Sequence, residues 1–253
     1  MDFGKIVSNS FKFPFRNIKK LLVLCILFIL ASIIPIGIIS DNRYVLFLGL
    51  ISFFLFILIV PGYLFSFVKI GLNESSLFPS LNFGNSIFDS LRVLALRMAY
   101  MIVPAVVFFI AWFTLDISSV NFNSPIEILS FLRTIGFSAL IVVLTYILFE
   151  ILLFFAKARL AYLNSLPEAL KIHKVIGDIR NIGILNIIKW VLFMALLVVI
   201  ASVVSSWIIA IPYVGFLIYL CIFIPILESI GNYSLGLLYA NIINDKLAKL
   251  EKI

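Results

Sequence analysis

The stretch LLVLCILFILASIIPIGIIS, residues 21–40, carries no charged side chain and has the length of about 20 apolar residues that a helix needs to cross a bilayer. Five further apolar runs follow, at 45–68, 98–115, 134–155, 184–211 and 214–239. Because hydrocarbon offers the backbone no hydrogen-bond partner, continuous runs of this kind are helical. The sequence therefore predicts an all-α, polytopic transmembrane helical bundle with six spans.

The composition agrees with a protein dissolved in lipid. Of its 253 residues, 64% are hydrophobic and 12% are charged, whereas soluble domains contain about 25% charged residues. We expect one transmembrane domain over 1–253, with an amphipathic N-terminal segment at 1–20 and a polar tail at 240–253. Outer connections of about four residues at 41–44 and about two at 212–213, with a longer one at 116–133, pair the spans as three hairpins.

The basic residues predict the orientation. The chain contains 19 Lys and Arg residues and has a net charge of +7. All of them except Arg43 and Arg133 fall in the N-terminal segment, in the long connections after the second and fourth spans, at the adjoining span ends or in the tail. Since Lys and Arg resist translocation, we expect a multi-pass protein of the cell membrane with both termini in the cytoplasm.

Two segments on the basic side have amphipathic patterns. In the first, apolar residues recur at nearly helical spacing between basic ones, and Pro14 predicts a kink; the apolar residues are Phe3, Ile6, Val7, Phe11, Phe15 and Ile18. In the second, residues 165–168 (SLPE) fit a capping box. A predicted helix then places Ala169, Ile172, Ile176 and Ile179 on one face and Glu168, Lys171, Lys174 and Asp178 on another.

These basic segments suggest lipid partners. No glycine loop or aromatic-basic motif typical of nucleic-acid binding accompanies them, and each Lys or Arg near an anionic surface contributes about 1 kcal/mol of attraction. We therefore expect membrane lipids, with anionic inner-leaflet headgroups, as partners and no nucleic acid; protein partners stay unknown. The predicted headgroup contacts are Lys12, Arg16, Lys19, Lys20, Lys171, Lys174 and Arg180.

Three stretches resemble motifs of a known family: FKFPFRNIKKLL at 11–22, PGYLFSFVKIG at 61–71 and GNYSLGLLYANI at 231–242. The chain resembles an uncharacterised domain-of-unknown-function family of six-helix integral membrane proteins that is frequent in methanogenic archaea. Here Phe13-Pro14-Phe15 replaces the family's Tyr-Pro-Phe-like entry. The resemblance spans nearly the whole chain and implies a six-helix bundle with cytoplasmic termini. It implies no activity and no site residues.

Two carboxylates lie inside predicted spans. Glu150 falls about 10 Å from the basic end of the fourth span and Glu228 about 16 Å from that of the sixth, at 1.5 Å per residue. An acidic residue at that depth costs about 2.5–3.5 kcal/mol unless a partner, a proton or water relieves it. Helical spacing aligns Tyr146 and Lys157 with Glu150, and Asn232 with Glu228, while Arg97 on the third span could reach Glu150.

Two hypotheses account for these acids. In the first, Glu150 and Glu228 line a shared, inward-facing polar cavity that binds a proton, a cation or a basic headgroup. In the second, Glu150 pairs with Arg97 or Lys157 as a structural contact, and protonated Glu228 bonds Asn232 or a backbone carbonyl. The residues of this intramembrane polar site are Glu150, Glu228, Tyr146, Asn232 and Arg97.

The sequence lacks the usual catalytic motifs. It contains no P-loop, no nucleophile elbow and no H-E-x-x-H pattern, and His173 is its only histidine. We expect no catalytic residue, no cofactor and no metal site. The leading interpretation is a non-enzymatic membrane protein that organises lipids or partner proteins at the cytoplasmic face. The alternative is a proton- or ion-coupled transporter of small molecules that uses Glu228 and Glu150.

Overall fold

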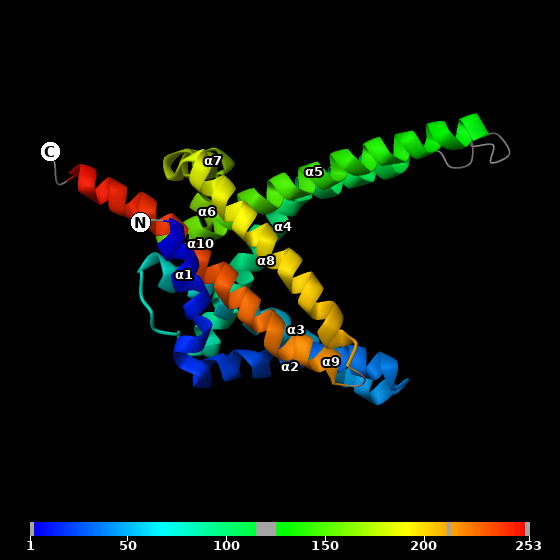
Figure 1. The fold of residues 1–253 in the computed structure, drawn as a ribbon, viewed down its shortest axis with the longest axis horizontal. Coiled ribbons are helices and arrows are strands. Elements are labelled where there is room, and N and C mark those ends of the chain that lie inside the picture. The colour runs from blue at the N-terminus through cyan, green and yellow to red at the C-terminus, as the bar shows by residue number, and fades with distance from the viewer. Residues whose placement is uncertain (1–2, 115–124, 212–213, 251–253) are drawn as a thin grey trace.

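The computed structural model describes residues 3–114, 125–211 and 214–250, and these contain helices and turns but no strand (Figure 1). Six helical segments of the described chain are long and apolar enough to cross a membrane. The predicted all-α class with six spans is confirmed. The elements are α1 (Phe3–Lys12), η1 (Pro14–Asn17), α2 (Ile18–Ile39), α3 (Arg43–Leu72), α4 (Phe83–Thr114), α5 (Pro125–Leu163), α6 (Leu166–Ala169), α7 (Ile172–Ile182), α8 (Ile184–Ile209), α9 (Gly215–Ile218), η3 (Tyr219–Phe223) and α10 (Ile224–Leu250).

Several spans are longer than hydropathy predicts, among them the third and the fourth. The third was expected to begin at residue 98, but α4 begins at Phe83 and runs without a break through Gly84. The fourth was expected to end at residue 155, but α5 continues to Leu163. Hydropathy locates where a helix enters hydrocarbon, whereas helical hydrogen bonds continue into polar surroundings at both sites. The expected tail lysines, and the connections at residues 115–124 and 212–213, lie outside the described side chains.

The central helix of the bundle is α3, which packs against α2, α4 and α10. The helices α4 and α5 also run side by side. The two helices of the last pair pack loosely: α8 lies close to α9 and η3, and it reaches α10 through side chains, among them Trp190, which contacts Ser234. This last pair is therefore not a closely packed hairpin.

The bundle has two arms. Along α4 the buried residues end at Pro104, and the described side chains of α5 are buried only from Leu152 onward. The halves of these helices beyond those positions expose apolar side chains and diverge from the remaining spans (Figure 1). We call the α4–α5 pair the first arm and the group α2, α3, α8 and α10 the second arm. In a membrane, lipid chains cover these exposed faces.

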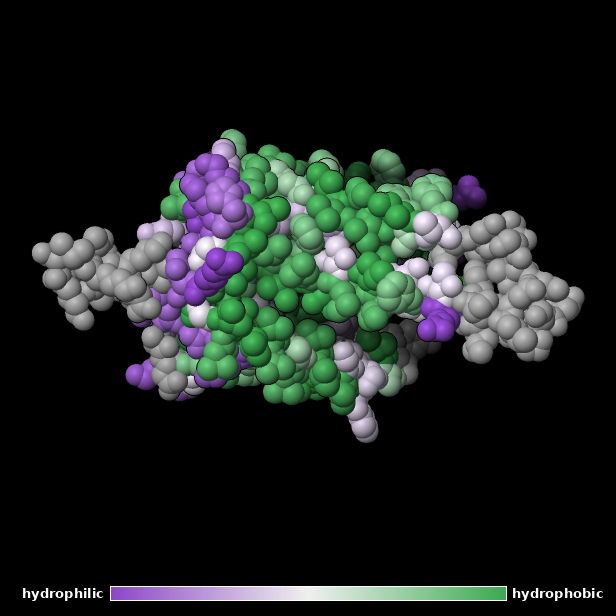
Figure 2. Space-filling model, turned by 90° about the horizontal axis from the view of Figure 1, so that it is seen from above, coloured by the Kyte–Doolittle hydropathy of each residue, from purple (hydrophilic) through white to green (hydrophobic). Residues whose placement is uncertain are grey.

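Polar and charged residues gather at one end of the molecule. Both termini, α1 and α7 lie at this end (Figure 1), and the space-filling view shows a hydrophilic surface there, next to a broad apolar band (Figure 2). We call it the basic end, because most of the described Lys and Arg residues belong to the segments that meet here. The turn between α2 and α3, with Arg43, lies at the opposite end.

The N-terminal segment kinks at Pro14 as expected, but its apolar residues do not form one face. The helix α1 packs against α10 and buries Ile6. Phe13 is fully buried, and its ring stacks on Tyr233 with centroids 4.0 Å apart. Phe11, Phe15 and Ile18 are exposed instead. Phe11 precedes Pro14, whereas Phe15 and Ile18 follow it, so the exposed apolar residues lie on both sides of the kink.

The predicted faces of the second amphipathic segment are wrong. The chain leaves the helical conformation between α6 and α7, which rotates the two halves relative to each other. As a result, α7 buries Val175, Asp178 and Ile182, while Ile172 and Ile176 are exposed. Ser165 precedes α6 but makes no side-chain cap hydrogen bond, so the expected capping box is absent.

Candidate functional site

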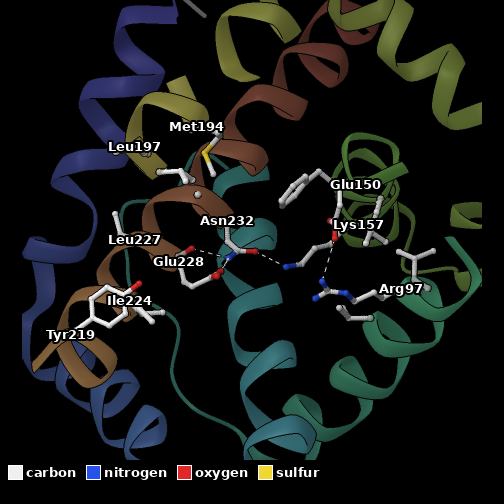
Figure 3. Close-up of a pocket in the computed structure, with 16 residues that line it drawn as sticks. Arg97, Glu150, Lys157, Met194, Leu197, Tyr219, Ile224, Leu227, Glu228 and Asn232 are labelled. Atoms are coloured by element: carbon white, nitrogen blue, oxygen red, sulfur yellow. Dashed lines mark hydrogen bonds and ion pairs between the residues drawn. The ribbon is translucent and has the colours of Figure 1, made fainter. Parts of the chain in front are cut away.

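A cavity of about 510 Å³ lies between α4, α5, α8 and α10 (Figure 3). Its polar lining residues are Arg97, Glu150, Lys157, Glu228 and Asn232, and its apolar walls include Leu153, Phe154, Met194, Leu197 and Leu227. Four of the five residues predicted for an intramembrane polar site therefore line one cavity. The fifth, Tyr146, lies at its edge on α5 and contacts Glu150.

Glu150 is held by two donors. Its Oε1 accepts a hydrogen bond from the Tyr146 hydroxyl at 2.8 Å and one from the Arg97 guanidinium at 3.2 Å. The Tyr146 contact follows from the spacing of four residues on one helix. The Arg97 contact joins α4 to α5, where a charged hydrogen bond inside the membrane gives the two helices a fixed register. The carboxylate side chain is 19% exposed, whereas that of Arg97 is 59% exposed.

Asn232 bridges the other two charges. Its Nδ2 donates to the Glu228 carboxylate at 3.1 Å and to the Glu228 backbone carbonyl at 2.8 Å. Its Oδ1 accepts from the Lys157 ammonium at 2.5 Å. Lys157 and Glu228 thus face each other across one amide instead of forming a direct ion pair (Figure 3). Asn232 itself is buried, and Glu228 is exposed to the cavity.

The partner of Lys157 was not predicted. Lys157 lies two helical turns from Glu150, and the sequence suggested a contact between them. Its side chain instead extends across the cavity to α10. The choice of partner depends on how α5 packs against α10, and the spacing of residues along one helix carries no information about that packing.

A layer of buried residues separates the cavity from the basic end. The Trp190 ring contacts those of Phe154 and Phe155, with centroids 5.6 and 6.0 Å apart, and its Nε1 donates to the Ser234 hydroxyl at 3.0 Å. Phe155, Trp190 and Ser234 are all buried. Aromatic side chains therefore border the cavity on the side of the basic end.

Beyond this layer, a buried acid fastens α7 to the bundle. Asp178 Oδ2 accepts hydrogen bonds from the Arg159 guanidinium and from the Tyr239 hydroxyl, the latter at 2.5 Å. Arg159 also donates from Nε to the Glu168 backbone carbonyl at 3.0 Å. The contacts join α7, α5, α10 and α6. One signal in the sequence points to this contact, since Asp178 shares its helical face with the apolar residues Val175 and Ile182.

The predicted headgroup contacts divide into two groups. Lys12, Arg16, Lys19 and Arg180 are exposed, and none of them forms an ion pair with a described residue. Lys171 and Lys174 bind Glu168 at 2.5 and 2.7 Å, and Lys20 donates to the Phe78 carbonyl at 2.6 Å. The hydrogen bonds from Lys171 and Lys174 lower the pKa of Glu168 to about 2.

Within the described residues, no group of three or more His, Cys, Asp or Glu side chains could hold a metal ion. The cavity residues can instead form ion pairs, donate and accept hydrogen bonds, and exchange protons. Counted with their formal charges, the two basic and two acidic side chains of the cavity sum to zero.

The fold and the site define a class of protein: a multi-pass α-helical membrane protein with charged residues inside its bundle. The chain belongs to the DUF4013 family, a family of proteins of unknown function whose sequence model matches residues 45–211. The expected membership of an uncharacterised family is confirmed. Of the three motifs that suggested it, 61–71 lies inside this match and the other two lie outside it. No curated protein and no solved structure matches the chain.

Proposed function

We propose that this protein is a non-enzymatic membrane protein that organises anionic lipids at its basic end, on the cytoplasmic side of the cell membrane. The observation that carries the proposal is the surface formed by η1 and its flanks. Lys12, Arg16 and Lys19 are exposed there beside the exposed Phe11 and Phe15. We call these five residues the lipid-facing segment.

The two kinds of side chain suit the two layers of a leaflet. Aromatic side chains of an amphipathic segment insert at the boundary between headgroups and acyl chains. Each cation near an anionic surface adds about 1 kcal/mol of attraction, which falls off within a Debye length. All five side chains are exposed, although the Phe11 ring also contacts the edge of the core at Phe193, with centroids 5.8 Å apart. Their exposed surfaces are therefore free for contacts with lipid.

The cytoplasmic location is part of the proposal. It is supported by the clustering of basic side chains around the two termini, since such residues stay on the side of synthesis. Anionic lipids of the inner leaflet would then meet the lipid-facing segment directly.

The test compares two sets of charge substitutions in the full chain. The protein is reconstituted in phosphatidylcholine vesicles containing pyrene-labelled phosphatidylglycerol, and energy transfer from tryptophan to pyrene reports enrichment of the anionic lipid. We expect enrichment for the wild type, which 1 M NaCl abolishes because the Debye length is then about 3 Å. The triple variant Lys12→Gln, Arg16→Gln, Lys19→Gln loses most of it.

The matched control is Lys171→Gln with Lys174→Gln, whose wild-type charges are partly compensated by Glu168. We expect a smaller loss per charge removed than in the triple variant. Equal enrichment in wild type and triple variant, or enrichment that does not depend on salt, would overturn the proposal.

One observation favours ion-coupled transport as a second candidate function. The last span is interrupted by the π-helical turn η3, which precedes Pro225 and lies one turn from Glu228. π-helical turns frequently occur at functional sites, and broken helices beside an acidic residue are typical of transporters. Proton uptake into proteoliposomes that is present in the wild type and absent in Glu228→Gln would support transport over lipid organisation.

A further inference from the structure

The charges of the cavity are only partly satisfied. Glu228 receives one side-chain hydrogen bond, to Oε2, and is exposed to the cavity. Arg97 makes one described hydrogen bond, although a guanidinium has five N–H donors. Both groups therefore retain hydrogen-bonding capacity toward the cavity. In a site surrounded by hydrocarbon, such capacity is costly unless water or a ligand uses it.

The charges are also separated in space. Arg97 and Lys157 come from α4 and α5, whereas Glu228 comes from α10, and the Asn232 amide lies between the two sides (Figure 3). Glu150 offsets the charge of Arg97. The cavity thus has a negative side toward α10 and a positive side toward the first arm, with no net charge.

This arrangement favours a ligand that carries both signs. A cation or an anion alone would leave one unit of charge uncompensated in a medium of low dielectric constant, at a cost of several kcal/mol. A zwitterion adds no net charge and can align its two ends with the two sides of the cavity. A volume of about 510 Å³ lies within the usual range for small-molecule sites, about 300–1,000 Å³.

The surroundings of the cavity favour a ligand with an apolar chain. Phe155, Trp190 and Ser234 close it toward the basic end. In the other direction the two arms diverge (Figure 1), and the side chains beyond the cavity on α5 and α8 are apolar and exposed, among them Leu144, Leu148 and Val203. An acyl chain leaving the cavity between the arms would remain in an apolar environment.

We propose that this cavity is a binding site for a zwitterionic amphiphile, with its ammonium group against Glu228, its phosphate against Lys157 and Arg97, and its chain between the two arms. The site differs from the lipid-facing segment in place and in chemistry. The lipid-facing segment binds any anionic surface at the basic end, whereas the cavity site selects one headgroup inside the bundle.

The experiment uses the full chain in non-ionic maltoside micelles and radiolabelled lysophosphatidylethanolamine as the probe. Measurement in 1 M NaCl suppresses the lipid-facing segment, because exposed charges are then screened beyond about 3 Å. We expect saturable binding, at least tenfold tighter than that of two competitors with similar chains, lysophosphatidylglycerol and an alkylamine. Equal affinity for either competitor, or no saturable binding of the probe, overturns the proposal.

Three variants test where the probe binds. Glu228→Gln keeps an acceptor for Asn232 but removes the negative charge, and we expect at least a tenfold loss of affinity. Leu227→Trp fills the cavity without changing its charge and has the same expected effect. The matched control is Leu192→Trp on α8, an exposed position outside the lining, which keeps wild-type affinity. Thermal unfolding in micelles verifies that each variant is folded.

The outcomes separate this proposal from the proposed function. Wild-type affinity in both Glu228→Gln and Leu227→Trp places the probe elsewhere and overturns the cavity site, while the salt-dependent enrichment of anionic lipid at the lipid-facing segment would be unaffected. Conversely, failure of that enrichment leaves the cavity measurement in 1 M NaCl unchanged.

Discussion

Asp178 shows how much a single buried acid contributes. Its side chain is 7% exposed and that of Arg159 is 12% exposed, so both have lost most of their contact with solvent. Their hydrogen bond, with the one from Tyr239, replaces that contact. Removing one partner of such a pair leaves the other buried and uncompensated, which costs more than the pair itself contributes.

We therefore expect Asp178→Ala to lower the free energy of unfolding by about 3–5 kcal/mol. Tyr239→Phe keeps the ion pair and removes one hydrogen bond to a charged group, for an expected loss of about 1.5–3 kcal/mol. Unfolding in mixed micelles of maltoside and SDS, followed by circular dichroism, measures both. A loss in Asp178→Ala no larger than that in Tyr239→Phe would contradict this account of the pair.

Glu168 predicts a pH dependence of stability. The pKa of this carboxyl group is lowered from 4.5 to about 2 by Lys171 and Lys174, so its stabilising contribution is fully present above pH 4.5 and disappears as the pH falls through 2. We expect the melting temperature of the wild type to exceed that of Glu168→Gln at pH 7, by a small amount because the group is partly exposed. The difference narrows toward pH 2, and a constant difference would show that Glu168 does not titrate as described.

Residues on one helix were predictable, and contacts between helices were less so. The spacing of four residues placed Tyr146 beside Glu150 and Asn232 beside Glu228, and the structure has both contacts. The contact between Lys157 and Asn232 depends on the rotation of α5 and α10 about their axes. Sequence periodicity therefore predicts contacts between residues of one helix, but it does not predict contacts between residues of different helices.

At the scale of elements, close packing of α3 depends on glycine. A Cβ atom at Gly62 would lie 1.9 Å from the Ser86 backbone oxygen of α4, and one at Gly236 of α10 would lie 2.3 Å from the Val68 backbone oxygen of α3. Lipid and protein side chains are equally apolar, so close backbone approach supplies much of the attraction between membrane helices. The glycines thus explain why α3 occupies the centre.

Gly236→Ala should destabilise the bundle by about 1–3 kcal/mol, because backbone atoms must move to admit the methyl group. The matched control is Gly136→Ala on α5, where a Cβ meets nothing within 4 Å. There we expect a neutral change or a gain of up to about 1 kcal/mol from helix propensity. Equal melting temperatures for the two variants in micelles would refute the packing argument.

The existence of the helices was predictable from the sequence, but the face that each helix packs against the bundle was only partly predictable. Apolar runs indicated six spans, because length and composition suffice for that inference. The amphipathic pattern of residues 169–179 assigned the wrong face to the bundle, since Asp178 is satisfied by Arg159 and Tyr239 rather than by water. In a sequence pattern, a polar residue that is buried in a bundle cannot be told from a solvent-exposed one when its hydrogen-bond partners lie on other helices.

At the scale of the whole molecule, the charge distribution defines two unlike ends. The basic end carries both termini and the hydrophilic surface (Figure 2), and the opposite end carries the exposed Arg43. The separation into two arms was not predictable, because hydropathy does not distinguish a face that packs on protein from one that packs on lipid.

Single-cysteine labelling tests the proposed orientation. In a Cys25→Ser, Cys221→Ser background, a membrane-impermeant maleimide should label Arg43→Cys in intact cells and Lys12→Cys only after permeabilisation. Both positions are exposed, so labelling of both in detergent is the control for reactivity. Labelling of Lys12→Cys in intact cells would reverse the orientation and remove the lipid-facing segment from the inner leaflet.

The position of α10 has a consequence for biogenesis. This helix leaves the ribosome after α1 and α3, yet it packs against both of them, and its Tyr233 stacks on Phe13. The earlier helices therefore enter the membrane before the surface that completes them has been translated. Insertion and assembly are consequently separate stages, and nascent chains that terminate before the last helix would present Phe13 and the glycine face of α3 to the cell's quality-control proteases.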